Sequence, residues 1–151
     1  MPTLIAQQVP IVRAFQPEDV QQLINRDGLQ CSHAHLLMQS QAGPAFTAEI
    51  NGHPVAAAGI MIPWPGLGMA WMVVQDGAAL PPLWLTRTIK RYVNALVQRH
   101  NLHRLEAVAV QDSLRNQRWL EALGFSSEQH GVARRYLADD RAVIRYERIE
   151  D

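Results

Sequence analysis

A long amphipathic helix between two apolar strands is the feature of this sequence that most constrains its fold. Residues 68–74 are apolar throughout, which is typical of a central strand. The helix that follows two consecutive prolines has one apolar face, made of Leu85, Ile89, Tyr92, Val93, Leu96 and Val97. Residues 103–110 then alternate as a strand. Because a strand–helix–strand connection within one sheet is right-handed and joins parallel strands, this segment predicts one parallel crossover.

The first half of the chain is expected to form strands at 11–15, 45–50 and 55–62, with short helices from residue 17 and within 29–40. A helix start at Pro17 is favoured because proline and the two acids after it suit a first helical turn. Asn51 and Gly52 accept the positive φ angles of a type I′ turn, so they predict a hairpin.

The segment after the crossover is expected to form a helix and two strands. Asp112 and Ser113 can cap a helix that runs to Leu123, and Gly124 stands where a left-handed residue ends many helices. The two strands are predicted at 133–137 and 142–149, with Asp139-Asp140 as their turn. Antiparallel hairpins on either side of a parallel crossover indicate the mixed α/β (α+β) class.

Composition limits the classes of protein to consider. With 151 residues, 48% of them hydrophobic, the chain is expected to fold as a single domain over residues 1–151, with 1–10 as an N-terminal extension. The 14 basic and 14 acidic residues balance, so no overall field attracts nucleic acid or a membrane. A single cysteine, Cys31, excludes an internal disulfide. Since neither a membrane-length apolar run nor a secretion signal is recognisable, the expected location is the cytoplasm.

The stretch from Ser113 to Phe125 carries the most specific motif of the sequence. Leu120-Glu121 and Leu123-Gly124-Phe125 fall in register with the last helix of the GCN5-related N-acetyltransferase (GNAT) superfamily, and the element order over 11–149 is similar to that of its members. The resemblance implies a mixed, mostly antiparallel central sheet with one parallel crossover and helices on both faces. It also implies transfer of an acetyl group from acetyl-CoA to an amine. The alternative is an unrelated fold with a similar element order.

The sequence departs from the family where active members hold the pyrophosphate of CoA. Members place a Gly-rich turn before the long helix, because side chains there would block the helix N–H groups from the phosphates. This segment has one glycine, Gly77, together with two prolines, Asp76 and the bulky Trp84. The tyrosine that many members use as general acid would fall at Leu120. These departures predict weak CoA binding.

The resemblance also implies where acetyl-CoA and the amine would bind. The backbone of the central strand would pair with the pantetheine arm, and side chains on the two following helices would hold the rest of CoA; the residues concerned are Met72, Val73, Val74, Arg87, Lys90 and Asn116. Glu49 and Asp76 are candidates for the base that deprotonates the amine, and the alternative is that each is an ordinary exposed carboxylate. No protein nucleophile is required, because the amine attacks the thioester directly.

A narrower resemblance points to a protein without catalytic activity. The sequence is similar to small acetyltransferase-like proteins of tailed phages, including the short internal virion protein of podoviruses. The similarity lies in residues 71–74, the acidic loop after them, the Arg/Lys helix and the motif around Trp119. That resemblance implies a scaffold in the virion that binds protein partners. Trp64 and Trp84 are the tryptophans expected to be exposed, so the turn at Trp64 and the helix from Leu83 are candidate partner surfaces.

The remaining reactive side chains predict neither a metal site nor a cysteine nucleophile. No carboxylate or thiolate completes a metal-binding set with the six histidines. Beyond His33, nothing near Cys31 indicates an activated thiolate. Seven basic residues against two acids in the segment 87–118 indicate either an anion site for CoA or nucleic acid or a solvated helix face.

Overall fold

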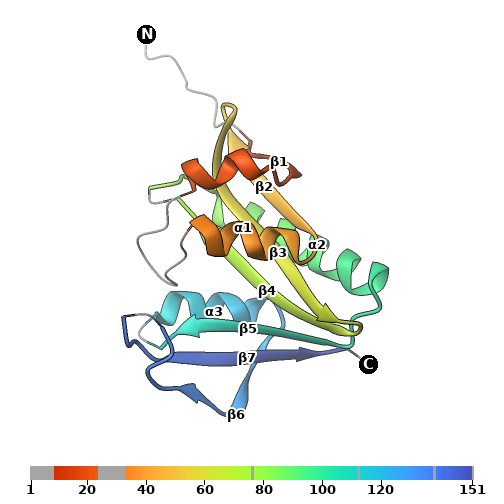
Figure 1. Ribbon diagram of the computed structural model, residues 1–151, viewed down its shortest axis with the longest axis vertical. Helices are drawn as coiled ribbons and strands as arrows, with labels where there is room; N and C mark the ends of the chain where they lie inside the picture. The colour runs from red at the N-terminus through yellow and green to blue at the C-terminus, as the bar shows by residue number, and fades with distance from the viewer. Residues whose placement is uncertain (1–8, 24–32, 76, 112, 138, 151) are drawn as a thin grey trace.

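The computed structural model describes residues 9–23, 33–75, 77–111, 113–137 and 139–150. Within them, seven strands form one sheet in the order β1-β2-β3-β4-β5-β7-β6 (Figure 1). The strands are β1 (Ile11–Ala14), β2 (Ala45–Ile50), β3 (His53–Trp64), β4 (Leu67–Val74), β5 (Arg104–Val110), β6 (Ser126–Ala133) and β7 (Val143–Ile149). The helices are η1 (Pro17–Gln22), α1 (His33–Gln41), α2 (Pro82–Arg99) and α3 (Leu114–Ala122).

The predicted parallel crossover is confirmed. β4 and β5 are parallel neighbours, and α2 connects them. The other neighbouring strands pair in antiparallel fashion. The sheet is therefore mixed and mostly antiparallel, as the element order indicates.

The predicted hairpin at Asn51 and Gly52 is also confirmed. Their φ angles are 55° and 76°, and β2 pairs with β3 on either side of this turn. The helix expected from Pro17 is a 3-10 helix, η1, and the helix expected within 29–40 begins at His33. Residues 24–32, which include Cys31, lie outside the described residues.

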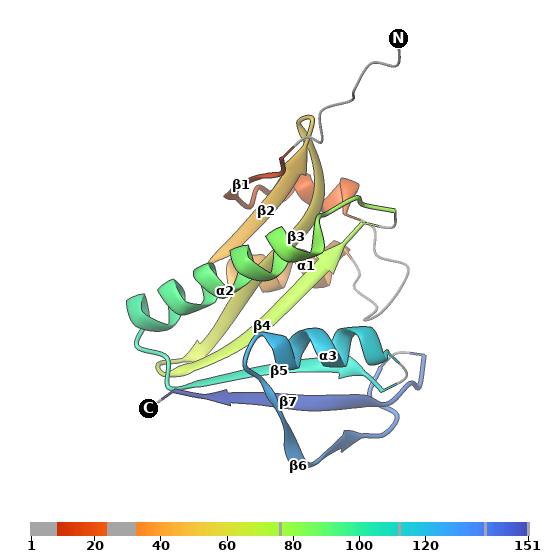
Figure 2. The same ribbon diagram turned by 180° about the vertical axis from the view of Figure 1, so that it is seen from behind.

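Two hydrophobic clusters hold the helices on opposite faces of the sheet (Figures 1 and 2). One lies beneath α2 and α3, where Val93 and Leu96 of α2 pack on a group that includes the fully buried Leu105 of β5. The other lies beneath η1 and α1, where Leu36 packs with Val73 of β4. Both faces of β4 are therefore covered by helices, which accounts for its apolar sequence.

The prediction of a strand at 133–137 is wrong. β6 occupies Ser126–Ala133, and the chain turns after it, with Arg135 at a φ of 53°. β6 begins Ser-Ser-Glu-Gln, a polar sequence without apolar alternation, and it is one of the two edge strands of the sheet. It is held by pairing with β7 and by an ion pair from Glu128 to Arg104, neither of which shows in its own sequence. None of the described helices is long and apolar enough to cross a membrane.

Candidate functional site

The opening between β4 and β5 is the most distinctive feature of the sheet. The two strands are in register only at Leu67–Arg104, Gly68–Leu105 and Met69–Glu106. Beyond these three pairs, no described residue of β4 pairs with β5, although β4 continues for five residues to Val74 and β5 for four to Val110. Five extended residues span about 17 Å. The strands thus part into a V whose vertex lies at Met69 and Glu106.

Backbone groups of alternate β4 residues face this opening. Near the vertex, the carbonyl oxygen of Gly66 accepts from the N–H of Arg104 at 3.2 Å, so Gly66 faces the β5 side. At the other end, the N–H of Gln75 donates to Val55 of β3 at 2.8 Å. Because backbone direction alternates along a strand, Met72 and Val74 face the opening.

By the same alternation, the backbone of Val73 pairs with β3, opposite Ala57. The three backbone positions expected to contact pantetheine therefore divide into two that face the opening and one that completes the β3–β4 ladder. The polar groups of Met72 and Val74 have no strand partner on the β5 side among the described residues. They can accept or donate hydrogen bonds to an extended ligand.

The first turn of α2 lies at the wide end of the V and offers few hydrogen-bond donors. Pro81 and Pro82 have no N–H, and the N–H of Leu85 already donates to the carbonyl of Pro81 at 2.9 Å. The N–H groups of Leu83 and Trp84 are the donors that remain in this turn. A phosphate could bind to them, but with less help from the backbone than a Gly-rich turn provides.

The cationic and amide side chains expected to hold CoA lie on neighbouring helices. Arg87 and Lys90 are exposed on α2, and Asn116 is exposed on α3. The two helices meet where the indole N–H of Trp119 donates to Thr86 Oγ1 at 3.3 Å. The expected set is therefore brought to one side of the sheet, the side that α2 and α3 cover.

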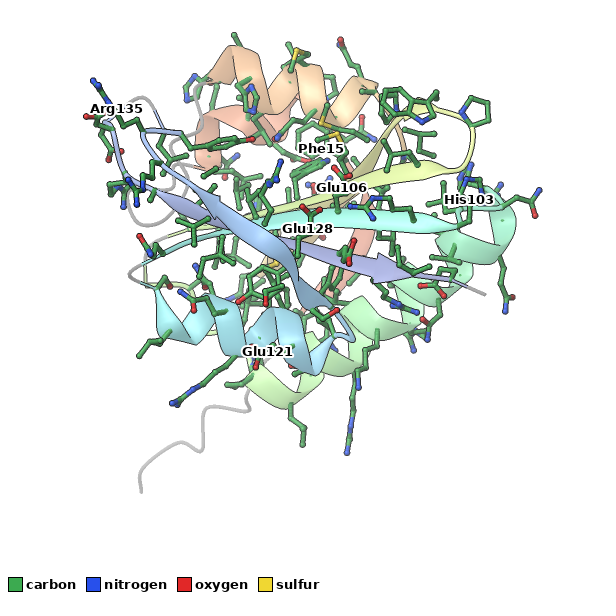
Figure 3. All side chains as sticks on the ribbon, turned by 90° about the horizontal axis from the view of Figure 1, so that it is seen from below. Phe15, His103, Glu106, Glu121, Glu128 and Arg135 are labelled. Carbon is green, nitrogen blue, oxygen red and sulfur yellow. The ribbon has the colours of Figure 1, made fainter. Side chains whose placement is uncertain are left out.

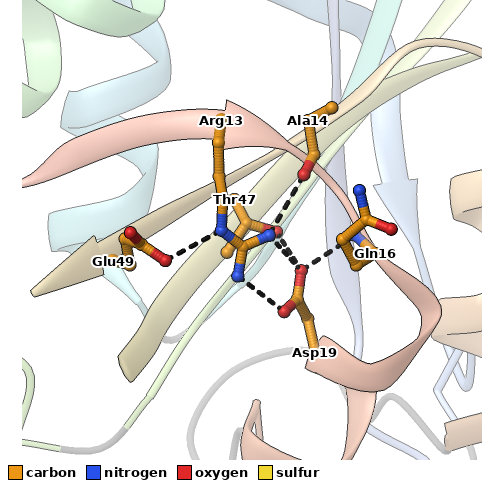
Figure 4. A network of polar contacts seen from close by, with 6 residues as sticks. All are labelled: Arg13, Ala14, Gln16, Asp19, Thr47 and Glu49. Atoms are coloured by element: carbon orange, nitrogen blue, oxygen red, sulfur yellow. Dashed lines mark hydrogen bonds and ion pairs between the residues drawn. The ribbon is translucent and has the colours of Figure 1, made fainter. Parts of the chain in front are cut away.

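Glu49 is not at the opening. It lies on β2, and β3 separates that strand from β4. Its carboxylate accepts from Arg13 Nε at 2.8 Å (Figure 4). The pKa of the Arg13 guanidinium is raised above its usual value, mainly by its hydrogen bond to Asp19 and to a lesser extent by its hydrogen bond to Glu49. Asp76, the other carboxylate expected as a base, lies outside the described residues.

A carboxylate that the sequence analysis did not single out lies at the vertex. Glu106 accepts from Arg104 Nε at 2.9 Å, and Arg104 also donates to Glu128 and Glu147, each at 2.6 Å. Figure 3 shows Glu106 and Glu128 next to each other. Hydrogen bonds to Glu106 and Glu147 raise the pKa of Arg104. The alternation of residues 104–108 places Glu106 on the same face as Arg104, but the other two carboxylates that Arg104 contacts, on β6 and β7, are 20 or more residues away, so the sequence gives no sign of the cluster.

The comparisons with known proteins show the fold. No protein-family model matches the sequence, and no curated protein matches it. Among solved structures, Ard1 from Thermoplasma volcanium is similar with a TM-score of 0.77 at 12% identity, over 93% of this chain and 97% of that one. The ribosomal-protein-S18-alanine N-acetyltransferase from Escherichia coli has a TM-score of 0.73 at 14% identity, over 93% and 94% of the two chains.

A third structure, an acetyltransferase of the GNAT family from Streptococcus pneumoniae, has a TM-score of 0.67 at 14% identity, over 94% of this chain and 99% of that one. The chain therefore has the fold of the GNAT acetyltransferases, nearly from end to end. These structures do not support the narrower resemblance to phage proteins, which stays a hypothesis. Within the described residues, no group of three or more His, Cys, Asp or Glu side chains could hold a metal ion.

Proposed function

We propose that this chain is an acyl-CoA-dependent N-acyltransferase that transfers an acetyl group to an amine. The observation that supports the proposal is the V between β4 and β5, where Met72 and Val74 present backbone groups without a strand partner. The pantetheine arm of acetyl-CoA is a thin chain with two amide groups, so it matches an opening about 17 Å long that offers alternate donors and acceptors.

The direction of the substrate follows from its charge. Its phosphates belong at the wide end of the V, with the N–H groups of Leu83 and Trp84 and the side chains of Arg87 and Lys90. Asn116 on α3 would contact the same part of CoA. The arm then runs along β4, and the thioester comes to lie near the vertex.

The chemistry proposed at the vertex needs no covalent intermediate on the protein. The nitrogen of a neutral amine attacks the thioester carbonyl, the C–S bond breaks, CoA leaves as a thiolate that takes a proton from water, and the amine loses one proton. Glu106 is the described carboxylate at the vertex, so we assign it the role of taking that proton. Arg104 holds it in place. Glu49, paired with Arg13 two strands away, is less suited to this role than the sequence analysis expects.

Calorimetric titration with acetyl-CoA tests the proposal. Binding in the micromolar range supports it, and absence of binding at millimolar acetyl-CoA refutes it. The variant Glu106→Gln is expected to bind acetyl-CoA as the parent does but to transfer acetyl groups about 100-fold more slowly to an accepted amine. The matched variant Glu18→Gln, at an exposed carboxylate on η1, should change neither property.

A second candidate function is a scaffold that binds protein partners, in a virion or elsewhere. The observation that favours it is Trp64, which is 62% exposed at the end of β3, as expected. Trp84 was also expected to be exposed, but it is half-buried because it lies one turn before the buried Thr88 on the same face of α2. If the protein does not bind acetyl-CoA, and if the variant Trp64→Ala no longer binds a protein partner that the parent binds, the protein acts as a scaffold.

A further inference from the structure

The fold separates the charges of this neutral chain. The whole sequence has 14 basic and 14 acidic residues. Helices α2 and α3 together contain six cations and one acid; they are Arg87, Lys90, Arg91, Arg99, Arg115, Arg118 and Glu121. These two helices therefore carry a formal charge of +5, and the remainder of the chain carries −5. Neutrality of the sum does not imply a neutral surface, and a polyanion near the helices would meet a positive field.

All six cations are exposed, and within the described residues none of them forms an ion pair. The contrast with β5 is direct, because Arg104 there contacts three carboxylates. α2 has no acidic residue in its 18 positions. Unpaired guanidinium groups keep their full hydrogen-bonding capacity for an external anion.

The cations extend well beyond the place where the phosphates of CoA would bind. Arg87 and Lys90 lie within the first turns of α2, but Arg91 and Arg99 are nine and seventeen residues after its start at Pro82. At 1.5 Å and about 100° per residue, Arg99 lies about 18 Å along the helix from Arg87 and about 120° around it, where it lines a hollow with Pro44 and Phe46. One CoA molecule does not require a positive surface of that length. A chain of phosphates does.

We propose that the outer surface of α2 and α3 binds the phosphodiester backbone of a nucleic acid. Five of the six cations are arginines, whose planar guanidinium matches phosphate oxygens in a bidentate manner. An anionic membrane is the less suitable partner, because the apolar face of α2 packs into the core through Val93 and Leu96 and cannot insert into lipid. Arg87 and Lys90 also belong to the proposed acetyl-CoA site, but Arg91, Arg99 and Arg118 are not assigned to it, so the inference does not require the acyltransferase proposal.

Fluorescence anisotropy with labelled single-stranded RNA and DNA 20-mers of one sequence tests the inference. We expect dissociation constants of about 10–100 µM at 0.1 M salt, in the range of non-specific binding. With three or four phosphate contacts, the logarithm of the association constant should fall with the logarithm of salt concentration at a slope of about −2 to −3. Binding to both 20-mers indicates recognition of the backbone, and binding to RNA alone indicates that the 2′-hydroxyl contributes.

A matched pair of variants locates the surface. Arg91→Gln/Arg99→Gln removes two cations of α2 away from its first turn and is expected to weaken binding roughly tenfold and reduce the salt slope by about 1.4. Arg134→Gln/Arg135→Gln removes two exposed cations after β6 and is expected to leave the slope unchanged. Affinity for acetyl-CoA should stay the same in both variants, which separates this surface from the proposed acyl-CoA site.

Three outcomes would overturn the inference. One is no anisotropy change at 1 mM protein and 50 mM salt. Another is an equal loss of binding in the two double variants, which would indicate a diffuse attraction to any cation. The third is binding to phosphatidylserine vesicles but not to the 20-mers, which would assign the surface to membranes.

Discussion

Replacement of Asp19 by alanine is expected to destabilise the fold by about 3 kcal/mol. The Asp19 side chain is 5% exposed and accepts four hydrogen bonds (Figure 4). Two come from Arg13 at 2.9 and 2.8 Å, one from the Gln16 N–H at 2.9 Å and one from Thr47 Oγ1 at 2.8 Å. These contacts connect η1 to both β1 and β2.

The magnitude follows from what the substitution leaves behind. Thr47 is fully buried, so its hydroxyl would lose its partner at a cost of about 1–3 kcal/mol. The Gln16 N–H would lose its acceptor at the start of η1, which costs about 1 kcal/mol. Arg13 keeps Glu49 and is 31% exposed, so its loss is discounted for solvent screening to about 0.5 kcal/mol.

Urea unfolding, followed by circular dichroism, measures the free energy of unfolding of the parent, Asp19→Ala and the exposed neighbour control Glu18→Ala. The control should lose less than about 0.5 kcal/mol. Thr47→Val should make Asp19→Ala less costly, because no buried hydroxyl then remains unpaired. A loss below about 1 kcal/mol for Asp19→Ala, or strict additivity with Thr47→Val, would refute the reasoning.

The same network predicts the pH dependence of stability. Burial alone raises the pKa of Asp19, but the hydrogen bonds from Arg13, Gln16 and Thr47 outweigh it and lower the pKa below its ordinary value. A folded-state pKa below the unfolded one gives stability that is present above the unfolded value, near 4, and is lost as pH falls through the folded value. The difference between parent and Asp19→Ala should therefore be constant from about pH 7 to 5 and shrink below about pH 4.

Three further predictions concern the sheet. Leu105→Ala, at a fully buried position, should cost about 2–5 kcal/mol in the free energy of unfolding measured with urea, and a loss below 1 kcal/mol would contradict its place at the centre of the core. Met72→Pro removes an N–H that faces the opening and should weaken acetyl-CoA binding about fivefold by calorimetry. Val73→Pro instead breaks the β3–β4 ladder and should lower the melting temperature. If Met72→Pro lowered the melting temperature and Val73→Pro weakened acetyl-CoA binding, the assignment of which residues face the opening would be wrong. Gly59→Ala would place a Cβ 2.6 Å from the Pro44 carbonyl oxygen and 2.8 Å from the Trp71 ring, so thermal unfolding should show a loss of about 1–3 kcal/mol, and an unchanged melting temperature would contradict that close packing.

The parts of the fold that the sequence predicted are those encoded by local signals. Helix α2 has a buried stripe, the β2–β3 turn has Asn51 and Gly52, and α3 is capped by Ser113, whose hydroxyl accepts from the Asn116 N–H at 3.4 Å. Each of these depends on residues within a few positions of one another. The parallel crossover between β4 and β5 could also be predicted, because a strand–helix–strand connection within one sheet is right-handed.

The parts that could not be predicted depend on pairing between distant segments. The carboxylate at the vertex, Glu106, is defined by where β4 stops pairing with β5, and no residue in either strand signals that point. The position of β6 depends on β7 and on Arg104. Whether the backbone groups of Met72, Val73 and Val74 face the opening or pair with β3 depends on the register between β3 and β4. That register is known from the structure and cannot be read from the sequence.

The narrow junction between β4 and β5 has a mechanical consequence. Three register pairs join the half-sheet β1–β4 to the half-sheet of β5, β7 and β6, whereas the β3–β4 and β5–β7 ladders have seven register pairs each. The junction can thus act as a hinge while every other ladder stays intact. A rotation of about 10° there would move the far end of β4 by about 3 Å, given an arm of about 17 Å. Such a motion would change the width of the V, and hydrogen exchange that is faster at Met72 and Val74 than at Val73 would report the missing β5 ladder there.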